Sequence, residues 1–279
     1  MCLIIFSYDV HPVFELIIAA NRDEFYQRPT APLDSWKDAP HVYAGRDLER
    51  GGTWMGASTS GKIAAVTNFR EPFQSLKTNA LSRGDLVSDF IKGSKSPVSY
   101  LEQFKEGPGE KGLGKEHNGF NLIAGDRSGL FYCSNRHCSN RAAVQEAGSK
   151  SETKSEVIQK LKPGIYGVSN HLLNTPWPKV EQSKERFGKI IKSKKIDIEA
   201  IFTMLADQAF APDDQLPDTG VGYEWEKMLS PVFIKSEIYG TRSSSVLLVT
   251  KNRQIQFVER TFVPGKKAET VEKNIMIRK

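Results

Sequence analysis

Apolar runs separated by turn-forming residues mark the start of the chain and predict two β-hairpins. Residues 3–8 and 14–20 are short, apolar and rich in β-branched side chains, and the sequence DVHP between them supplies a turn. The runs GTWMGAS and IAAVTNF flank a second turn, TSGK, in which Gly61 provides the backbone freedom that a tight turn requires. Two consecutive hairpins indicate an antiparallel sheet.

The apolar positions then change to helical spacing. Helices are predicted over LVSDFIKG, with Ser82 or Asp85 as the N-cap, and over PVSYLEQFKEG, which begins with Pro and ends at Gly. NGFNLIAGD and GLFYCSN predict a further hairpin around DRSG. Residues 148–162 are polar and read as a surface loop before the short strand IYGVSN.

In the last third of the chain, helices are again followed by strands. PKVEQSKERFGKIIKS and DIEAIFTMLADQAF predict two helices, an acidic Pro-rich loop follows, and PVFIK, SSVLLVT and QIQFVER predict three strands. Helices segregated onto antiparallel sheets indicate an α+β fold, arranged as a layered sandwich. We expect a single domain over residues 1–279, without internal repeats.

Composition narrows the classes of protein to which the chain can belong. Of its 279 residues 39% are hydrophobic, enough for a sizeable core, and the net charge of +6 is spread over local Lys-rich runs. We find no nucleic-acid-binding motif, and expect small anionic molecules rather than nucleic acid as partners. No run is long and apolar enough for membrane insertion, and the N-terminus lacks the features of a signal peptide. These features predict a cytoplasmic protein, whose three cysteines are reduced thiols.

Cys2 carries the first candidate chemistry. Met followed by a small residue is a good candidate for removal of the initiator, which would leave Cys2 with a free α-amine beside its thiol. The reference pKa values of the two groups are close, so the amine can accept the thiol proton and activate the sulfur as a nucleophile. The alternative is a buried cysteine that simply begins a strand.

Polar residues at the ends of apolar strands add to this candidate site. Pairing across the first hairpin places Cys2 opposite residues 19–22, where NRDE supplies Arg22 and Asp23 as possible partners of the thiolate and the α-ammonium. The same polar segment could instead be the solvent-exposed end of a strand. Further strand ends carry Asn68, Asn170 and Arg242. Amide donors suit the oxyanion of acyl transfer, although Asn at a strand end is also a common turn residue, and Arg242 could be exposed.

With these residues in hand, the chain resembles the NRDE family, also called the Transport and Golgi organisation 2 family, in its bacterial form. The matching stretches are MCLIIFSY, AANRDEFYQRPTAP, AGRDLERGGTWMG, AAVTNFRE, YGVSNHLLNTPWPK and YGTRSSSVLLV. The family looks like a branch of the N-terminal nucleophile hydrolases, which implies a four-layer αββα sandwich. It is most similar to the cysteine branch that contains penicillin V acylase and bile salt hydrolase.

The resemblance also implies a role for each candidate residue. Cys2 would be the nucleophile and amine base, Asn170 the oxyanion donor, and Arg242 the distal arginine. Arg22 and Asp23 would match an Arg and an Asp that the cysteine branch spaces further apart, and Asn68 would match a polar residue after a strand. These roles imply a hydrolase of a linear amide bond.

A second function is left open by the resemblance. Eukaryotic relatives have been associated with secretion, lipid metabolism and haem trafficking, so the same cleft could belong to a non-catalytic carrier of haem or another amphipathic anion. His171 is the candidate haem ligand in that case. Cys133, His137 and Cys138 lack the second ligand pair of a zinc site, and we expect no metal and no resident cofactor. The oligomeric state stays open.

Overall fold

The computed structural model describes residues 2–104, 112–136 and 158–278, which form two antiparallel sheets. The six-stranded sheet has the order β10 (Gly164–Val168), β1 (Cys2–Tyr8), β2 (Phe14–Phe25), β11 (Tyr239–Thr250), β12 (Gln254–Thr261) and β13 (Glu269–Met276). The seven-stranded sheet has the order β3 (Thr30–Trp36), β4 (Ala39–Asp47), β5 (Met55–Ser58), β6 (Ile63–Asn68), β7 (Phe120–Asp126), β8 (Gly129–Ser134) and β9 (Ile158–Lys160).

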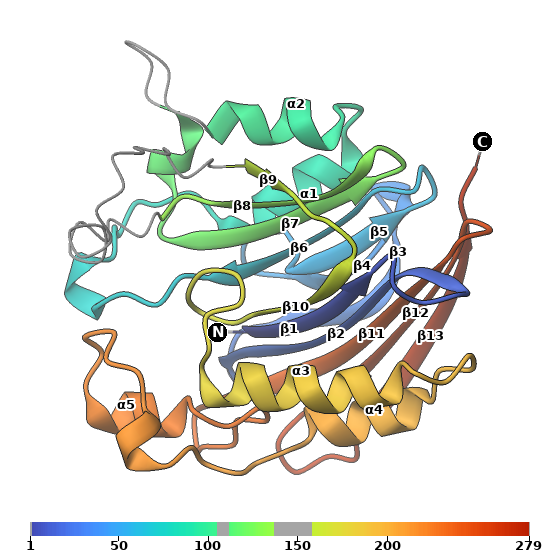
Figure 1. Ribbon diagram of the computed structural model, residues 1–279. Helices are drawn as coiled ribbons and strands as arrows, with labels where there is room; N and C mark the ends of the chain where they lie inside the picture. Colours follow the sequence, from blue (N-terminus) through green and yellow to red (C-terminus); the bar gives the residue numbers. More distant parts are fainter. Residues whose placement is uncertain (1, 105–111, 137–157, 279) are drawn as a thin grey trace, which may run out of the picture.

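Five α-helices and four short 3-10 helices lie in the described residues. They are α1 (Arg83–Lys92), α2 (Pro97–Leu101), α3 (Pro178–Ile190), α4 (Ile198–Leu205), α5 (Tyr223–Met228), η1 (Phe73–Ser75), η2 (Glu102–Phe104), η3 (Leu113–Glu116) and η4 (Asp213–Gln215). Figure 1 shows α1 and α2 on the outer face of the seven-stranded sheet, and α3 and α4 on the outer face of the six-stranded sheet. The layers are therefore αββα, and the α+β prediction is confirmed.

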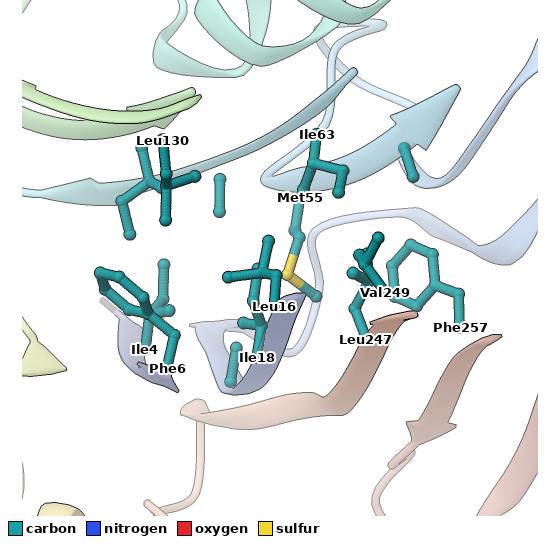
Figure 2. Packing of buried hydrophobic residues seen from close by; sticks show 14 of the residues in the cluster. Ile4, Phe6, Leu16, Ile18, Met55, Ile63, Leu130, Leu247, Val249 and Phe257 are labelled. Carbon is teal, nitrogen blue, oxygen red and sulfur yellow. The ribbon is translucent and has the colours of Figure 1, made fainter. Parts of the chain in front are cut away.

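Three hydrophobic clusters hold these layers together. The central cluster fills the space between the sheets, where Ile18 and Leu247 of the six-stranded sheet face Met55 and Ile63 of the other sheet (Figure 2). A second cluster joins α1 and α2 to the seven-stranded sheet, and a third joins α3 and α4 to the six-stranded sheet. The alternation of side chains along each strand supplies both faces with apolar groups, because successive residues point to opposite sides.

Local sequence signals explain many of the element boundaries. Ser82 caps α1 by accepting a hydrogen bond from the backbone N–H of Gly84, as one of the two expected caps. Gly61 adopts a φ of 84° in the turn between β5 and β6, as that hairpin predicts. Pro178 begins α3, where its missing N–H costs no helical hydrogen bond.

Other predictions of secondary structure are wrong. PVFIK is not a strand: Lys235 forms only an isolated bridge with Gly240, and Val232 and Ile234 are buried as packing residues of an irregular segment. The described end of the expected loop 148–162 contains β9, because backbone groups there pair with β8 and form the edge strand of the sheet. The helix predicted over DIEAIFTMLADQAF ends at Leu205.

The sequence patterns also missed three strands, β3, β4 and β13. Their polar residues and prolines hide the alternation on which strand prediction depends. In the described part of the chain, no helix combines the length and the apolar character needed to cross a bilayer.

Candidate active site

The hairpin of β1 and β2 places Cys2 beside the polar end of the neighbouring strand. Cys2 is paired with Arg22 in the register of the two strands, which confirms the prediction that it lies opposite residues 19–22. The hydroxyl of Ser169, which follows β10, donates to the carbonyl oxygen of Cys2 over 3.1 Å. The backbone of Cys2 is thus held by its pairing with β2 and by the residue that follows β10, and the residue is half-buried.

A pocket of about 250 Å³ opens at this end of the two sheets. Four of the six candidate residues line it: Cys2, Arg22, Asp23 and Asn68. They come from β1, β2 and β6, so both sheets contribute to the pocket. The loop before α1 and the first residues of that helix complete the wall.

Asp23 is a buried carboxylate in the lining of the pocket. One of its oxygens accepts a hydrogen bond from the Thr241 hydroxyl over 2.7 Å, and 2% of the residue is exposed. Burial raises the pKa of Asp23, while the Lys179 ammonium and the Thr241 hydrogen bond oppose that rise. Burial also raises the pKa of the Cys2 thiol, and the Asp23 carboxylate adds to the effect. The thiol therefore favours its protonated form when no base accepts the proton.

Arg22 is buried but remains part of the pocket wall. Its guanidinium lies over the Trp54 ring at 4.3 Å from the ring centroid, and donates to the Thr30 hydroxyl over 3.3 Å. A carboxylate oxygen of Glu24 lies 3.8 Å from the same guanidinium. The positive charge of Arg22 lowers the pKa of Cys2, opposing the effect of burial. Stacking and hydrogen bonding leave Arg22 with one preferred orientation.

Asn68 and Asn170 meet where the two sheets approach each other. The side-chain amide of Asn170 donates to the backbone oxygen of Asn68 over 3.0 Å, and its side-chain oxygen accepts from Ser169 over 3.2 Å. Asn170 is fully buried and is not among the residues that line the pocket, whereas the half-buried Asn68 is. Asn170 therefore lies behind the pocket and is linked to it by hydrogen bonds with Asn68 and with Ser169, which binds the Cys2 carbonyl.

Arg242 has a structural position outside the pocket lining. It lies in a β-bulge of β11, and its guanidinium donates to the backbone oxygens of Phe25, Tyr26 and Arg28, each over 3.0 Å. These bonds hold the turn that follows β2, including Arg28, which lines the pocket. Arg242 thus contributes to the site indirectly, by holding the conformation of this turn.

His171 is also outside the pocket lining. Its ring packs against Phe69 and Trp177, with centroid distances of 4.8 Å and 6.0 Å, and one ring nitrogen lies 2.8 Å from the Thr175 hydroxyl. Partial burial lowers the pKa of the ring. These contacts are those of a packed aromatic residue.

The sequence analysis missed a group of buried charges behind Asp23. Lys179, the second residue of α3, is 5% exposed, donates to the Leu229 carbonyl over 2.8 Å, and has a pKa lowered to about 8, mainly by burial. Arg70 and Glu226 form a buried ion pair, and the Arg70 guanidinium lies over the Trp177 ring at 4.7 Å. A helical Lys next to Pro carries no sequence signal of such a site, because only tertiary packing brings α3 against β1 and β10 and places Lys179 near Asp23.

No metal centre is found among the described residues, because no group of three His, Cys, Asp or Glu side chains is gathered there. Cys133 is buried in β8. His137 and Cys138, which the sequence analysis considered with it, lie outside the described residues.

Comparison with known proteins defines the family. The profile of the family described as "Transport and Golgi organisation 2" matches residues 1–264. The Transport and Golgi organization 2 homologs of Mus musculus and Homo sapiens are 34% and 35% identical to this chain, with 94% of both chains covered. The Drosophila melanogaster protein is 28% identical, and 94% of this chain and 92% of its own length are covered.

A solved structure matches over most of the chain at low identity. It is a C2A mutant of the conjugated bile acid hydrolase from Clostridium perfringens, with a TM-score of 0.43, 9% identity, and coverage of 98% of this chain and 92% of that chain. The family profile and the mammalian relatives each extend over nearly the whole sequence. The chain therefore belongs to the Transport and Golgi organisation 2 family.

Proposed function

We propose that this protein hydrolyses a linear amide bond, with Cys2 as the N-terminal nucleophile after Met1 has been removed. The observation that carries the proposal is the pairing of Cys2 with Arg22, which puts a thiol, a guanidinium and a buried carboxylate around one pocket. Cys2 is the cysteine that lines this pocket among the described residues. Under the proposal, the αββα fold acts as a rigid frame for this cluster.

The raised pKa of the thiol defines what the reaction needs. A neutral thiol is a weak nucleophile, so a general base must accept its proton. The α-amine of a mature Cys2 is within the same residue, and its reference pKa of about 7.7–8.0 suits this task near neutral pH. Asp23 would hold the amine through its buried carboxylate, which Thr241 orients.

The proposed reaction then takes two steps. The sulfur attacks the amide carbonyl carbon while the thiol proton moves to the α-amine; the C–N bond breaks, and the leaving nitrogen takes that proton. A thioester remains on Cys2. Water then adds to the thioester carbonyl and gives a proton to the α-amine, the C–S bond breaks, and the sulfur recovers the proton as the carboxylic acid product leaves.

Negative charge on the carbonyl oxygen requires neutral donors during both steps. We assign the side-chain amide of Asn68 as a donor, because Asn68 lines the pocket. Asn170 acts as a positioning residue in this scheme, since its amide donates to the Asn68 backbone oxygen. Arg242 is assigned the same kind of role through the three carbonyl groups that it binds.

Intact mass and acylation test the proposal together. Purified protein should lack Met1, and p-nitrophenyl hexanoate should add one hexanoyl group at Cys2, with release of p-nitrophenolate. Cys2→Ala should abolish the adduct, whereas Cys133→Ala should retain it, because Cys133 is buried in β8. A form with an N-terminal extension has no free amine on Cys2 and should react at a strongly reduced rate.

Two results would contradict the proposal. One is a purified protein that keeps Met1, and the other is a mature Cys2 that reacts no faster than the Cys2 of the extended form.

Carriage of haem or another amphipathic anion is the second candidate function. Its support is the set of cationic side chains in the pocket wall, which suits an anionic ligand. Titration with haem, followed by absorbance, should then show saturable binding that survives Cys2→Ala and weakens in Arg22→Gln. Binding that also weakens in His171→Ala would support His171 as the iron ligand, and the absence of saturable binding would exclude haem carriage.

A further inference from the structure

Three cationic side chains in the pocket wall have no carboxylate partner among the described residues. They are Arg50, Lys77 and Arg83, and no Asp or Glu oxygen there lies within ion-pair distance of their charged nitrogens. Arg83 donates to the backbone oxygen of Gly119 over 3.1 Å, and Lys77 donates to that of Lys115. Backbone oxygens accept hydrogen bonds but do not neutralise the cations.

The carboxylates of the same pocket are already engaged by other groups. Asp47 accepts two hydrogen bonds from Arg28, over 2.9 Å and 2.7 Å. The Glu24 carboxylate lies 3.8 Å from Arg22 and 3.9 Å from Arg28, and Asp23 binds Thr241. With five cationic and three acidic side chains in the wall, the pocket keeps a positive excess on the side of Arg83.

The position of Arg83 makes it the strongest of the three anion-binding candidates. It is the first residue of α1 and is half-buried, whereas Arg50 and Lys77 are exposed at the rim. Burial lowers the pKa of its guanidinium, and the carboxylates of Glu24 and Glu71 oppose this shift. A cation that is partly removed from water gains most from an anion that enters the pocket.

The backbone around Arg83 adds to this potential. Gly52 packs so closely on α1 that a Cβ atom there would lie 2.6 Å from the carbonyl carbon of Gly84. This contact brings the start of α1 into the pocket wall, and the N-terminal end of a ten-residue helix carries partial positive charge.

We propose that the ligand of this pocket is an amide that carries a carboxylate a few bonds from the reacting carbonyl, and that Arg83 binds this carboxylate. Arg83 is thus a specificity-determining residue, with Lys77 and Arg50 attracting the anion at the rim. The amide part of the ligand rests on the function proposed for Cys2, whereas the carboxylate part rests on the pocket wall. A guanidinium binds a carboxylate through two parallel N–H groups, which an ammonium cannot do.

Binding to Cys2→Ala protein tests the inference without any chemistry. N-hexanoylglycine carries the carboxylate on the amine side and N-propylsuccinamic acid carries it on the acyl side; N-hexanoylglycinamide and N-propylsuccinamide are the neutral counterparts. Calorimetry should show that one acid binds at least about tenfold more tightly than its neutral counterpart, as expected for a charged hydrogen-bonded pair. The acid that binds more tightly than its neutral counterpart shows whether the ligand carries its carboxylate on the amine side or on the acyl side of the amide.

Substitution of Arg83 provides the matched comparison. Arg83→Gln should remove most of the preference for the acid, Arg83→Lys should retain an intermediate preference, and Arg127→Gln, in the exposed turn between β7 and β8, should leave it unchanged. Thermal unfolding of each variant shows that the fold is kept. If Arg83→Gln does not fold, the Arg83→Lys result decides.

Equal binding of each acid and its neutral counterpart would overturn the inference, and so would a failure of all four compounds to bind. Neither result bears on acylation of Cys2 by p-nitrophenyl hexanoate, which has no carboxylate. Conversely, a preference for the acid that depends on Arg83 would stand even if Cys2 were unreactive.

Discussion

The two halves of β2 and β11 differ in character although they share one ladder of backbone hydrogen bonds. Residues 16–20 of β2 and 246–249 of β11 are apolar and fill the space between the layers. Residues 21–24 and 241–245 are polar or charged, and most of them are buried as well. The change falls at the same level in both strands, where Ala20 pairs with Ser245.

The difference shows how a polar site can be buried without loss of order. In the polar half, Ser244 donates to Asn21 over 2.6 Å, and Asn21 donates to the backbone oxygens of Leu205 and Val232. These hydrogen bonds offset the cost of removing the Asn21 and Ser244 side chains from water. The apolar half contributes cohesion, while the polar half is positioned by the ladder that continues from it.

The largest expected effect of a single change lies in the apolar half. Leu247→Ala removes a fully buried side chain from the cluster between the sheets, and should lower the free energy of unfolding by about 2–5 kcal/mol. Urea denaturation measures the loss. The control is Met276→Ala, at a side chain 62% exposed, which should change the free energy of unfolding by less than about 0.5 kcal/mol. Acylation of Cys2 per folded molecule should be unchanged; a loss confined to acylation would contradict the division between the halves.

A pH-dependent effect is expected beside the polar half, at Glu259 of β12, which pairs with Ser245. Burial raises the pKa of Glu259 to about 7, while its oxygens accept hydrogen bonds from the Leu33 N–H and from Ser245. Because the folded state holds this proton more tightly than the unfolded state, stability falls as the pH rises from about 4.5 to about 7.

Glu259→Gln should remove this loss. As the pH rises from 5 to 8, the free energy of unfolding of the variant should increase relative to that of the parent chain by up to about 3 kcal/mol. This difference corresponds to a shift of about two units in the pKa of Glu259. Thermal unfolding across this pH range measures the difference, with exposed Glu269→Gln as the control. Parallel profiles of parent and variant would show that Glu259 keeps an ordinary pKa.

The smallest effect tests a single hydrogen bond of the polar half. Ser244→Ala leaves the Asn21 side-chain oxygen without the donor seen in the structure, and should cost about 1 kcal/mol of unfolding free energy. Ser94→Ala, at an exposed serine, should cost almost nothing. If both variants are equally stable, the polar half does not depend on its side-chain hydrogen bonds.

Periodicity in the sequence was most informative where the two ends of an element carry their own signals. The first hairpin, the Ser82 cap of α1 and the Pro178 start of α3 are set by residues within one turn of the boundary. The same reasoning failed for PVFIK, because a short apolar run is also what a buried irregular segment requires. Strand β9 was missed because its pairing with β8 is not visible in its own polar sequence.

The candidate site shows the same boundary between local and tertiary information. The sequence by itself determined the hairpin that sets Cys2 beside Arg22, because the strand lengths and the turn define that register. Only the tertiary structure decided that Asn68 lines the pocket while Asn170 lies behind it. The tertiary structure also decided that Arg83 of α1 joins the pocket wall and that Lys179 of α3 lies near Asp23. Pairing within a hairpin follows from a few adjacent residues, whereas contacts between layers depend on how whole sheets and helices pack.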